Sequence, residues 1–561
     1  MFVLLGLLVG AKMFFVGLLP DEEYQITMSY RLSQGDGLFN RSWDTIQTSG
    51  FLNVALIRLY LWLTGGTEGL VLFLRGCGLL IQLAVSVFFG RTLLRKGLDR
   101  AGAWTIGFAF FCTYQKLIAS PDFSNMQLWF MTVMLCVLWK AYDAYRGTGK
   151  VGPAPLIVAA LCLCGVILSQ ACFVLVPVMA AALCILFRGR RLRANLLFFG
   201  TCAVTGCLYA AGIVLKHGLD TVLTAVTGVF GGDLTHATGA NLMGQSVILT
   251  YAKNTITIAL YVAAITIVAL ALTYAAGKIR GRKCSGNSLL LLCNLFAAAV
   301  TLYHWLWQGS GYDGMKLFIP VCVLSAGVLL LGMKKEARPA QQELAIPVLG
   351  VVVGFAVFLN VLFVSNVPLT NNLCFLLSSV LWSLVLMAQL RAKEAKNTAY
   401  GIIAVVTATI FLGTLVTLPS SPAGCLVSDA TDRVTAGPAK GIFTSGKVAE
   451  VYNSVTAAFT KTVPQGAGVV LVTNSFENTL LDYCYLLNDV DICHYSVNST
   501  PSFSMKLEEY WNLYPEKYPD VIAVNRSTYH VWEWDWILYY LENYYHYDRV
   551  VSTEYADFYF R

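Results

Sequence analysis

The chain has 561 residues, of which 57% are hydrophobic and 13% are charged, and its mean hydropathy is +0.63. Soluble globular proteins carry about 25% charged residues, so this chain lacks the charge needed to solvate its own surface. A one-domain soluble enzyme, a disordered chain and a nucleic-acid-binding protein are therefore excluded. The net charge of +7 indicates no nucleic-acid partner, because most charges lie in short clusters between apolar runs. That pattern is typical of polytopic membrane proteins.

Apolar stretches along the chain predict the membrane-spanning helices. A span needs about 20 largely apolar residues to cross roughly 30 Å of hydrocarbon. We therefore expect a polytopic α-helical membrane protein with about thirteen transmembrane helices. The predicted spans are residues 1–19, 69–90, 101–118, 124–142, 154–168, 171–187, 194–215, 255–277, 288–307, 317–333, 344–364, 372–390 and 400–418.

The loops between these spans predict their orientation. Basic residues gather in alternate loops, as they do on the cytoplasmic side of membrane proteins. They are Arg91, Arg95, Lys96, Arg100, Lys140, Arg146, Lys150, Arg188, Arg190, Arg191, Arg193, Lys278, Arg280, Arg282, Lys283, Lys334, Lys335, Arg338, Arg391, Lys393 and Lys396. The opposite loops contain few Lys and Arg. The predicted outer side, which includes the C-terminal part of the chain, holds all six His, and it also holds ten of the fifteen carboxylates of the membrane part. The sequence thus predicts a cytoplasmic N-terminus and titratable chemistry on the outer side.

The last part of the chain differs in composition, because charges appear there at ordinary density after a linker that begins at Pro419. Alternating strand and helix patterns predict a small α/β layer with parallel pairing. The predicted strands are 468–472, 491–495, 520–524, 549–552 and 557–559. The predicted domains are a transmembrane domain, 1–418, with a catalytic outer loop, 20–68, and a small extracytoplasmic α/β domain, 419–561.

The outer loop 20–68 holds the strongest candidate for chemistry. Asp21, Glu22 and Glu23 follow directly after the first predicted span. Carboxylates beside hydrocarbon are costly unless they face water or a ligand, so one interpretation is a functional role. The other is that they favour the positive N-terminus of a helix over 22–33. The residues alone leave both interpretations open.

Two other outer segments carry charges that suit chemistry. Asp122 lies in the short loop that begins at Lys116; an Asp in such a position is often a helix N-cap. Asp313 and Lys316 lie at the outer mouth of the tenth predicted span. A lysine there either snorkels to the interface or binds a phosphate.

These residues resemble the GT-C membrane glycosyltransferases, which use polyprenyl-phosphate-linked sugars and include protein O-mannosyltransferases and lipid A aminoarabinose transferases. The pair Asp21–Glu22 is similar to the acidic pair that opens their first outer loop, and Asp122 to the acidic residue between their third and fourth spans. Lys316, in MKLFIP, resembles the basic residue of their phosphate-binding RYLLP-like segment. The segment 168–177 is similar to their LTKGP…LP loop, with Gln170 in place of its lysine. The segment 437–444 (GPAKGIFT) and the α/β tail also resemble bacterial, uncharacterised members of this superfamily.

The resemblance implies a membrane glycosyltransferase that moves a sugar from a polyprenyl-phosphate donor to an acceptor hydroxyl on the outer face, with inversion. Asp21 is then the base, Glu22 orients it or holds the acceptor, and Asp122 positions substrate or a metal. The candidate substrate-binding residues are Arg58, Gln170, Asp313 and Lys316. The three carboxylates are the oxygen ligands that Mg²⁺ or Mn²⁺ prefers, so the cofactor prediction is open between none and one of these cations.

Other functions stay open at this stage. They are a transporter or flippase of a polyprenyl-linked glycan intermediate, a polymerase or ligase of surface polysaccharide, and a membrane scaffold. Transporters usually show internal repeats, which the two halves of this sequence lack. The acceptor is open between a lipid, a glycan and a protein, in contact with membrane lipids and with no nucleic acid. The predicted location is a bacterial plasma membrane, which the chain crosses many times.

Overall fold

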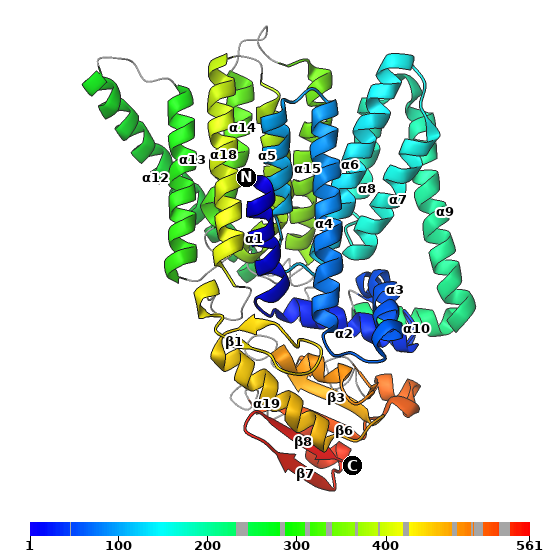
Figure 1. The fold of residues 1–561 in the computed structure, drawn as a ribbon. Helices are drawn as coiled ribbons and strands as arrows, with labels where there is room; N and C mark the ends of the chain where they lie inside the picture. Colours follow the sequence, from blue (N-terminus) through cyan, green and yellow to red (C-terminus); the bar gives the residue numbers. More distant parts are fainter. Residues whose placement is uncertain are drawn as a thin grey trace.

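The structure is a computed structural model that describes most of the chain. The described residues are 1–44, 47–231, 245–280, 286–308, 315–332, 339–364, 369–390, 393–418, 426–473, 479–494, 497–498, 509–526 and 539–561. Upright helices form a bundle, a small sheet packs against one end of it, and α2 lies across that end between the two (Figure 1).

The helices follow the apolar runs of the sequence. Their bounds are α1 Phe2–Phe15, α2 Pro20–Gln34, α3 Gln47–Thr64, α4 Leu70–Arg95, α5 Arg100–Phe111, α6 Phe123–Thr148, α7 Pro153–Ser169, α8 Leu175–Leu186, α9 Arg191–His217, α10 Leu219–Gly231, α12 Gln245–Arg280, α13 Gly286–Tyr303, α14 Met315–Gly332, α15 Gln341–Val364, α16 Leu369–Asn372, α17 Leu377–Ala388, α18 Lys393–Val416 and α19 Gly446–Thr462. Each predicted span overlaps one of these helices.

Among the described residues, six helices are long and apolar enough to cross a membrane. They are Leu70–Arg95, Arg188–His217, Tyr251–Ile279, Gly286–Trp307, Gln341–Leu362 and Ala395–Val416. The predicted count of about thirteen spans is not confirmed, because several other helices are short. For example, α1 has 14 residues and α5 has 12. At 1.5 Å per residue they reach about 21 Å and 18 Å, less than the roughly 30 Å of hydrocarbon.

The third predicted span, 101–118, ends earlier than the sequence suggested. The helix α5 stops at Phe111, and residues 112–122 run without α-helix to the start of α6. This segment, the re-entrant loop, is largely buried. Non-helical backbone is tolerated inside a helical bundle where protein surrounds it or where it lines a cavity. Gly78 of α4 permits the close approach, since a Cβ there would lie 1.8 Å from the Ala119 carbonyl oxygen.

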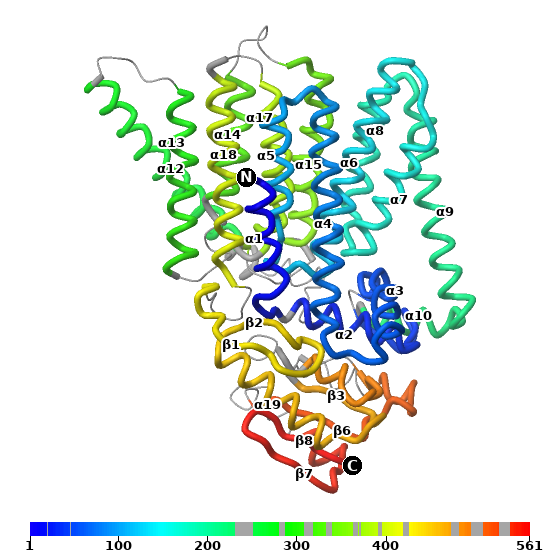
Figure 2. The backbone as a smooth tube through the Cα atoms, in the orientation of Figure 1, coloured from blue at the N-terminus to red at the C-terminus, as the bar shows by residue number. Residues whose placement is uncertain are grey.

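Three of the predicted basic loops lie at the same end of the bundle. The connections from α4 to α5, from α6 to α7 and from α8 to α9 all lie at the end of the bundle away from the sheet, and the C-terminus lies beyond the opposite end (Figure 2). These connections include Lys96, Lys150 and Arg188. The two ends of the bundle therefore differ in charge, and the side of the membrane that each faces stays a prediction.

The C-terminal sheet has mixed strand directions. Its strands are β3 Gly468–Thr473, β4 Asp491–Ile492, β5 Val497–Asn498, β6 Val521–Asn525, β7 Arg549–Ser552 and β8 Ala556–Phe560, in the order β4-β3-β6-β8-β7 with β5 also paired to β3. The predicted parallel pairing is confirmed for β3 with β4, β5 and β6, whereas β8 is antiparallel to β6 and β7. The boundary at 418 stays a prediction, because residues 419–425 lie outside the described chain.

One hydrophobic core joins the sheet to the bundle. Ile26 and Tyr30 of α2 and Leu74 of α4 belong to the same buried cluster as Phe459 of α19 and Leu471 of β3. Burial of apolar surface stabilises such contacts by roughly 25 cal/mol per Å². The sheet therefore holds α2 in place against the end of the bundle.

Candidate functional site

The first turn of α2 directs its three carboxylates to three different surroundings. Pro20 occupies the first position of the helix, where its missing N–H costs nothing. Asp21, Glu22 and Glu23 follow in the first turn and favour the positive end of the helix dipole. Successive helical residues are about 100° apart, so each carboxylate meets a different neighbour.

Asp21 forms an ion pair with the re-entrant loop. The Nζ of Lys116 lies 2.7 Å from Oδ2 of Asp21, whose side chain is 42% exposed. The same ammonium lies over the ring of Phe123, 3.8 Å from its centroid. Asp21 is thus a carboxylate that is held in position and remains accessible to a substrate.

Asp122 lies next to this pair and is fully buried. Its Oδ1 accepts a hydrogen bond from the Asn125 N–H at 2.9 Å, which caps α6, and its Oδ2 accepts one from the Ser124 hydroxyl at 2.6 Å. Burial raises the pKa of Asp122 to about 6, although the nearby Lys116 charge and these hydrogen bonds oppose the shift; the charge of Asp21 adds to it. We therefore expect Asp122 to change its charge near pH 6.

Glu22 is buried in a different ion pair. Arg75 of α4 forms a bidentate ion pair with Glu22: its Nε lies 2.8 Å from Oε1, and its Nη2 lies 2.5 Å from Oε2. The Ser120 hydroxyl donates a further hydrogen bond to Oε1. Because these donors engage both oxygens, Glu22 anchors the first turn of α2 to α4 and to the re-entrant loop.

Glu23 faces the C-terminal sheet domain. Its Oε1 accepts a hydrogen bond from the Tyr483 N–H at 2.9 Å, at the 3-10 helix η6 (Thr479–Leu486). Burial raises the pKa of Glu23 well above its usual range, and the charge of Asp482 adds to the shift. Glu23 thus lies buried in the contact between α2 and the sheet domain, where burial favours its neutral form.

The other candidate residues are more dispersed. Arg58 on α3 is exposed, and its guanidinium lies 3.4 Å from the carbonyl oxygen of Ser33, in the last turn of α2 and far from Asp21. Gln170 directly follows the last residue of α7, and its buried Oε1 has no hydrogen-bond partner in the part of the chain that the structure describes. Lys316 lies in the first turn of α14, with its side chain outside the described part, and Asp313 lies outside the described residues altogether.

The structure brings Asp21 and Asp122 together around Lys116, while Glu22 points to Arg75. Across the described ranges, no three His, Cys, Asp or Glu side chains form a group that could hold a metal ion. The binding of Mg²⁺ or Mn²⁺ by the three carboxylates therefore stays a prediction. Lys116 has no role in the prediction from sequence, although a single cation near Asp122 in a short outer loop was a signal for one.

The chain was compared with known proteins. No protein-family model and no curated protein sequence matches it. Among solved structures, it is similar to the archaeal oligosaccharyltransferase AglB from Archaeoglobus fulgidus, which was solved in complex with an inhibitory peptide and a dolichol-phosphate. The TM-score is 0.45 and the sequence identity is 10%, over 94% of this chain and 69% of that chain. A TM-score of this size does not establish a shared fold, so the function has to be inferred from the residues of this chain.

Proposed function

We propose that the protein is a membrane glycosyltransferase that transfers a sugar from a polyprenyl-phosphate donor to an acceptor hydroxyl. The observation that carries the proposal is the cluster of accessible Asp21, Lys116 at 2.7 Å and buried Asp122, at the end of an apolar helical bundle. A base and a cation side by side are what this reaction requires, and a lipid-linked donor reaches such a site from the bilayer.

The chemistry needs one proton acceptor and a cation for the leaving group. The acceptor oxygen forms a bond to the anomeric carbon of the sugar as the bond from that carbon to the phosphate oxygen breaks, and the electron pair leaves with the phosphate. Asp21 takes the proton of the acceptor hydroxyl, as a general base worth typically 10²–10⁴-fold. The phosphate leaves without a proton, unlike the leaving group in glycoside hydrolysis. A single displacement of this kind inverts the anomeric carbon.

Lys116 and Lys316 are the proposed phosphate-binding cations. Lys116 moves its ammonium from Asp21 to the donor phosphate, because a lysine binds phosphate as a point charge. This exchange frees the carboxylate of Asp21 for the acceptor. Lys316 binds the same phosphate in the proposal, and Gln170 and Asp313 contact the sugar. Arg58, which the sequence suggested as a second cation for this phosphate, lies at the other end of α2 from Asp21 and is too far away to bind it.

Asp122 and Glu22 support the reaction without accepting the proton. Asp122 positions the re-entrant loop that carries Lys116, through its hydrogen bonds at the start of α6. Glu22 orients the first turn of α2 through Arg75. We propose no obligatory cofactor, with Mg²⁺ or Mn²⁺ as the alternative, and a bacterial plasma membrane in which the sheet domain faces outward.

The test is transfer by the purified full-length protein from radiolabelled polyprenyl-phosphate sugars. Asp21→Asn should lower the rate by at least about 100-fold, because it removes the base and retains the shape of the side chain. Asp220→Asn, on the exposed first turn of α10, is the matched control and should retain the wild-type rate. Transfer by Asp21→Asn at the wild-type rate would contradict the assignment of the base. Tight donor binding by the wild type without turnover would contradict the proposed reaction.

A further inference from the structure

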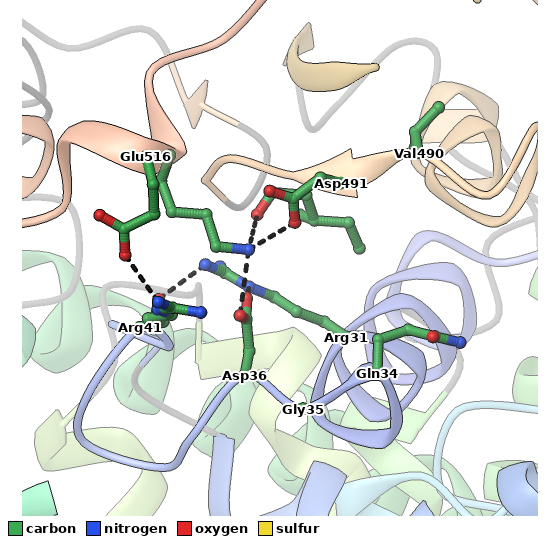
Figure 3. A pocket seen from close by; sticks show the side chains of 10 residues that line it. Arg31, Gln34, Gly35, Asp36, Arg41, Val490, Asp491 and Glu516 are labelled. Carbon is green, nitrogen blue, oxygen red and sulfur yellow. Dashed lines mark hydrogen bonds and ion pairs between the residues drawn. The ribbon is translucent and has the colours of Figure 1, made fainter. Parts of the chain in front are cut away.

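A polar cavity of about 220 Å³ opens where the end of α2 meets the sheet domain (Figure 3). We call it the junction cavity. It is lined by Arg31, Gln34, Gly35, Asp36 and Arg41 from α2 and the loop that follows, and by Val490, Asp491, Ile492, Glu516 and Lys517 from the sheet domain. Both walls thus carry charged side chains. Val490 and Ile492, in the wall formed by the sheet domain, are the apolar side chains of the lining.

The charges around the junction cavity cancel in pairs. Lys517 lies between two carboxylates, 3.0 Å from Asp36 and 2.5 Å from Asp491, and is 5% exposed. Arg31 also pairs with Asp36, and Arg41 pairs with Glu516 at 2.7 Å. Burial alone would raise the pKa of Asp36, but Arg31 and Lys517 outweigh it and hold that pKa below its usual value. The cavity therefore favours neither an anion nor a cation.

The lining also retains hydrogen-bonding atoms that the described chain does not use. Nη1 of Arg31, Nη1 of Arg41 and the amide of Gln34 make no hydrogen bond to it. Oδ2 of Asp491 and Oε2 of Glu516 accept none from it. Donors and acceptors thus stand together on a lining that has no net charge. A hydroxyl group both donates and accepts hydrogen bonds, so adjacent hydroxyls match this arrangement.

We infer that the junction cavity binds one uncharged, hydroxyl-rich unit, a neutral sugar residue. Its volume is below the roughly 300–1,000 Å³ of pockets for drug-sized ligands, which limits the occupant to a single unit. The buried ion pairs of Asp36 with Arg31 and Lys517 make this part of the lining rigid, and rigid sites bind with less loss of entropy. Arg31 is fixed in this way by Asp36, by the Arg41 carbonyl oxygen at 2.6 Å and by the Tyr510 hydroxyl at 2.8 Å.

The junction cavity is separate from the proposed transfer site. Gln34 lies thirteen positions after Asp21 on α2, which is about 20 Å along the helix axis. A sugar bound there is a remote unit of the acceptor rather than the reacting one. Binding energy from remote parts of a substrate promotes the reaction at the distant centre. This assignment to the acceptor rests on the proposed function, whereas the binding of the sugar does not.

The experiment measures sugar binding by the full-length protein in detergent micelles. Saturation-transfer NMR would be recorded with the methyl glycosides of glucose, galactose, mannose and N-acetylglucosamine, and with glucuronic acid and glucosamine as charged probes. We expect one or more neutral glycosides to bind and both charged probes to bind more weakly. Gln34→Ala removes a side chain with no partner in the described chain and should weaken binding about three- to tenfold, as expected for one hydrogen bond. Asp491→Asn should do the same.

Two further variants distinguish sugar binding in the junction cavity from effects elsewhere on the sheet domain and from loss of transfer. Gln465→Ala, an exposed glutamine elsewhere on the sheet domain, should bind the sugar like the wild type. Asp21→Asn should also bind it normally even though transfer is lost. The inference is overturned if no neutral glycoside binds, if a charged probe binds most tightly, or if Gln34→Ala and Asp491→Asn bind like the wild type. Sugar binding that depends on Gln34, in a protein without transfer activity, would support the cavity and contradict the proposed reaction.

Discussion

Asp21 and Asp122 lie close enough for their charges to interact, yet they differ in exposure to solvent and in their hydrogen-bond partners. Asp21 is 42% exposed and faces the Lys116 ammonium. Asp122 is fully buried and is satisfied by the Ser124 hydroxyl and the Asn125 N–H. An accessible carboxylate can receive a proton from a substrate, whereas a buried capping residue cannot reach one. The base is therefore assigned to Asp21.

The buried position of Asp122 predicts a pH-dependent contribution to stability. Burial raises its folded-state pKa from 3.8 to about 6, so the folded protein binds this proton more tightly than the unfolded chain. Stability from this group is full below about pH 4 and is lost as the pH rises to about 6. Asp122→Asn keeps an N-cap residue and removes the titration. Above pH 6 the variant should therefore be the more stable protein, by roughly 1.4 kcal/mol per unit of pKa shift.

The measurement is the midpoint of thermal unfolding in detergent between pH 4 and pH 8. The curves of the wild type and Asp122→Asn should diverge between about pH 4 and pH 6 and then run parallel. Asp548→Asn, an exposed residue before β7, should follow the wild type throughout. Curves for Asp122→Asn that stay parallel to the wild type at every pH would rule out this titration.

At the scale of elements, the re-entrant loop depends on one glycine of α4. A Cβ on Gly78 would lie 1.8 Å from the Ala119 oxygen and 2.9 Å from the Ala119 carbon. The close atoms belong to the backbone of Ala119, which cannot rotate away as a flexible side chain can. The added Cβ would therefore displace the whole loop. The loop carries Lys116 and leads into Asp122, and a shift would separate Lys116 from Asp21.

Gly78→Ala should therefore lower both stability and transfer. Overpacking of a buried contact costs about 1–3 kcal/mol, although alanine is the better helix former by about 1 kcal/mol. Gly76→Ala on the same helix is the matched control, because its Cβ would meet the Phe14 ring at an ordinary 3.4 Å. Thermal unfolding and transfer rates of the two variants should differ clearly. Equal behaviour would show that the loop does not rest against Gly78.

At the scale of the whole molecule, the sheet domain holds α2 at both ends. Near its start, Glu23 accepts from the Tyr483 N–H, and Thr27 donates to the Asp482 carbonyl oxygen at 3.2 Å. Near its end, Arg31 donates to the Tyr510 hydroxyl. Since α2 also carries Asp21, the sheet domain positions the proposed base although it lies far from it in sequence.

Loss of one ion-pairing side chain between α2 and the sheet domain should lower the stability of the folded protein and the rate of transfer. Lys517→Met removes the ammonium that pairs with Asp36 and Asp491 and leaves Asp36 with Arg31 alone. We expect a loss of about 1–3 kcal/mol, as for a buried hydrogen-bonded charge, with slower transfer because α2 is held less firmly. Lys461→Met on the exposed side of α19 is the control. Thermal unfolding and transfer assays check the pair, and equal losses would contradict a role for the junction.

Several features follow from the sequence by itself. Apolar runs indicated where helices form, because a chain with so little charge must bury those runs in the protein or place them in the membrane. Alternation of hydrophobic strands with helices predicted the sheet, including the parallel pairing of β3 with β6. The acidic start of α2 was visible as Asp21, Glu22 and Glu23 after an apolar run.

The contacts that these residues make depend on how distant segments pack together. The sequence places Arg75 in the middle of an apolar run, and packing turns it toward Glu22. It gives no sign that this helix ends at Phe111, several residues before the predicted loop, because the end depends on the close approach of Ala119 to Gly78. The junction cavity joins residues more than 450 positions apart, such as Asp36 and Lys517. Local patterns determine elements through short-range periodicity, whereas ion pairs and cavities between distant segments depend on how those elements pack.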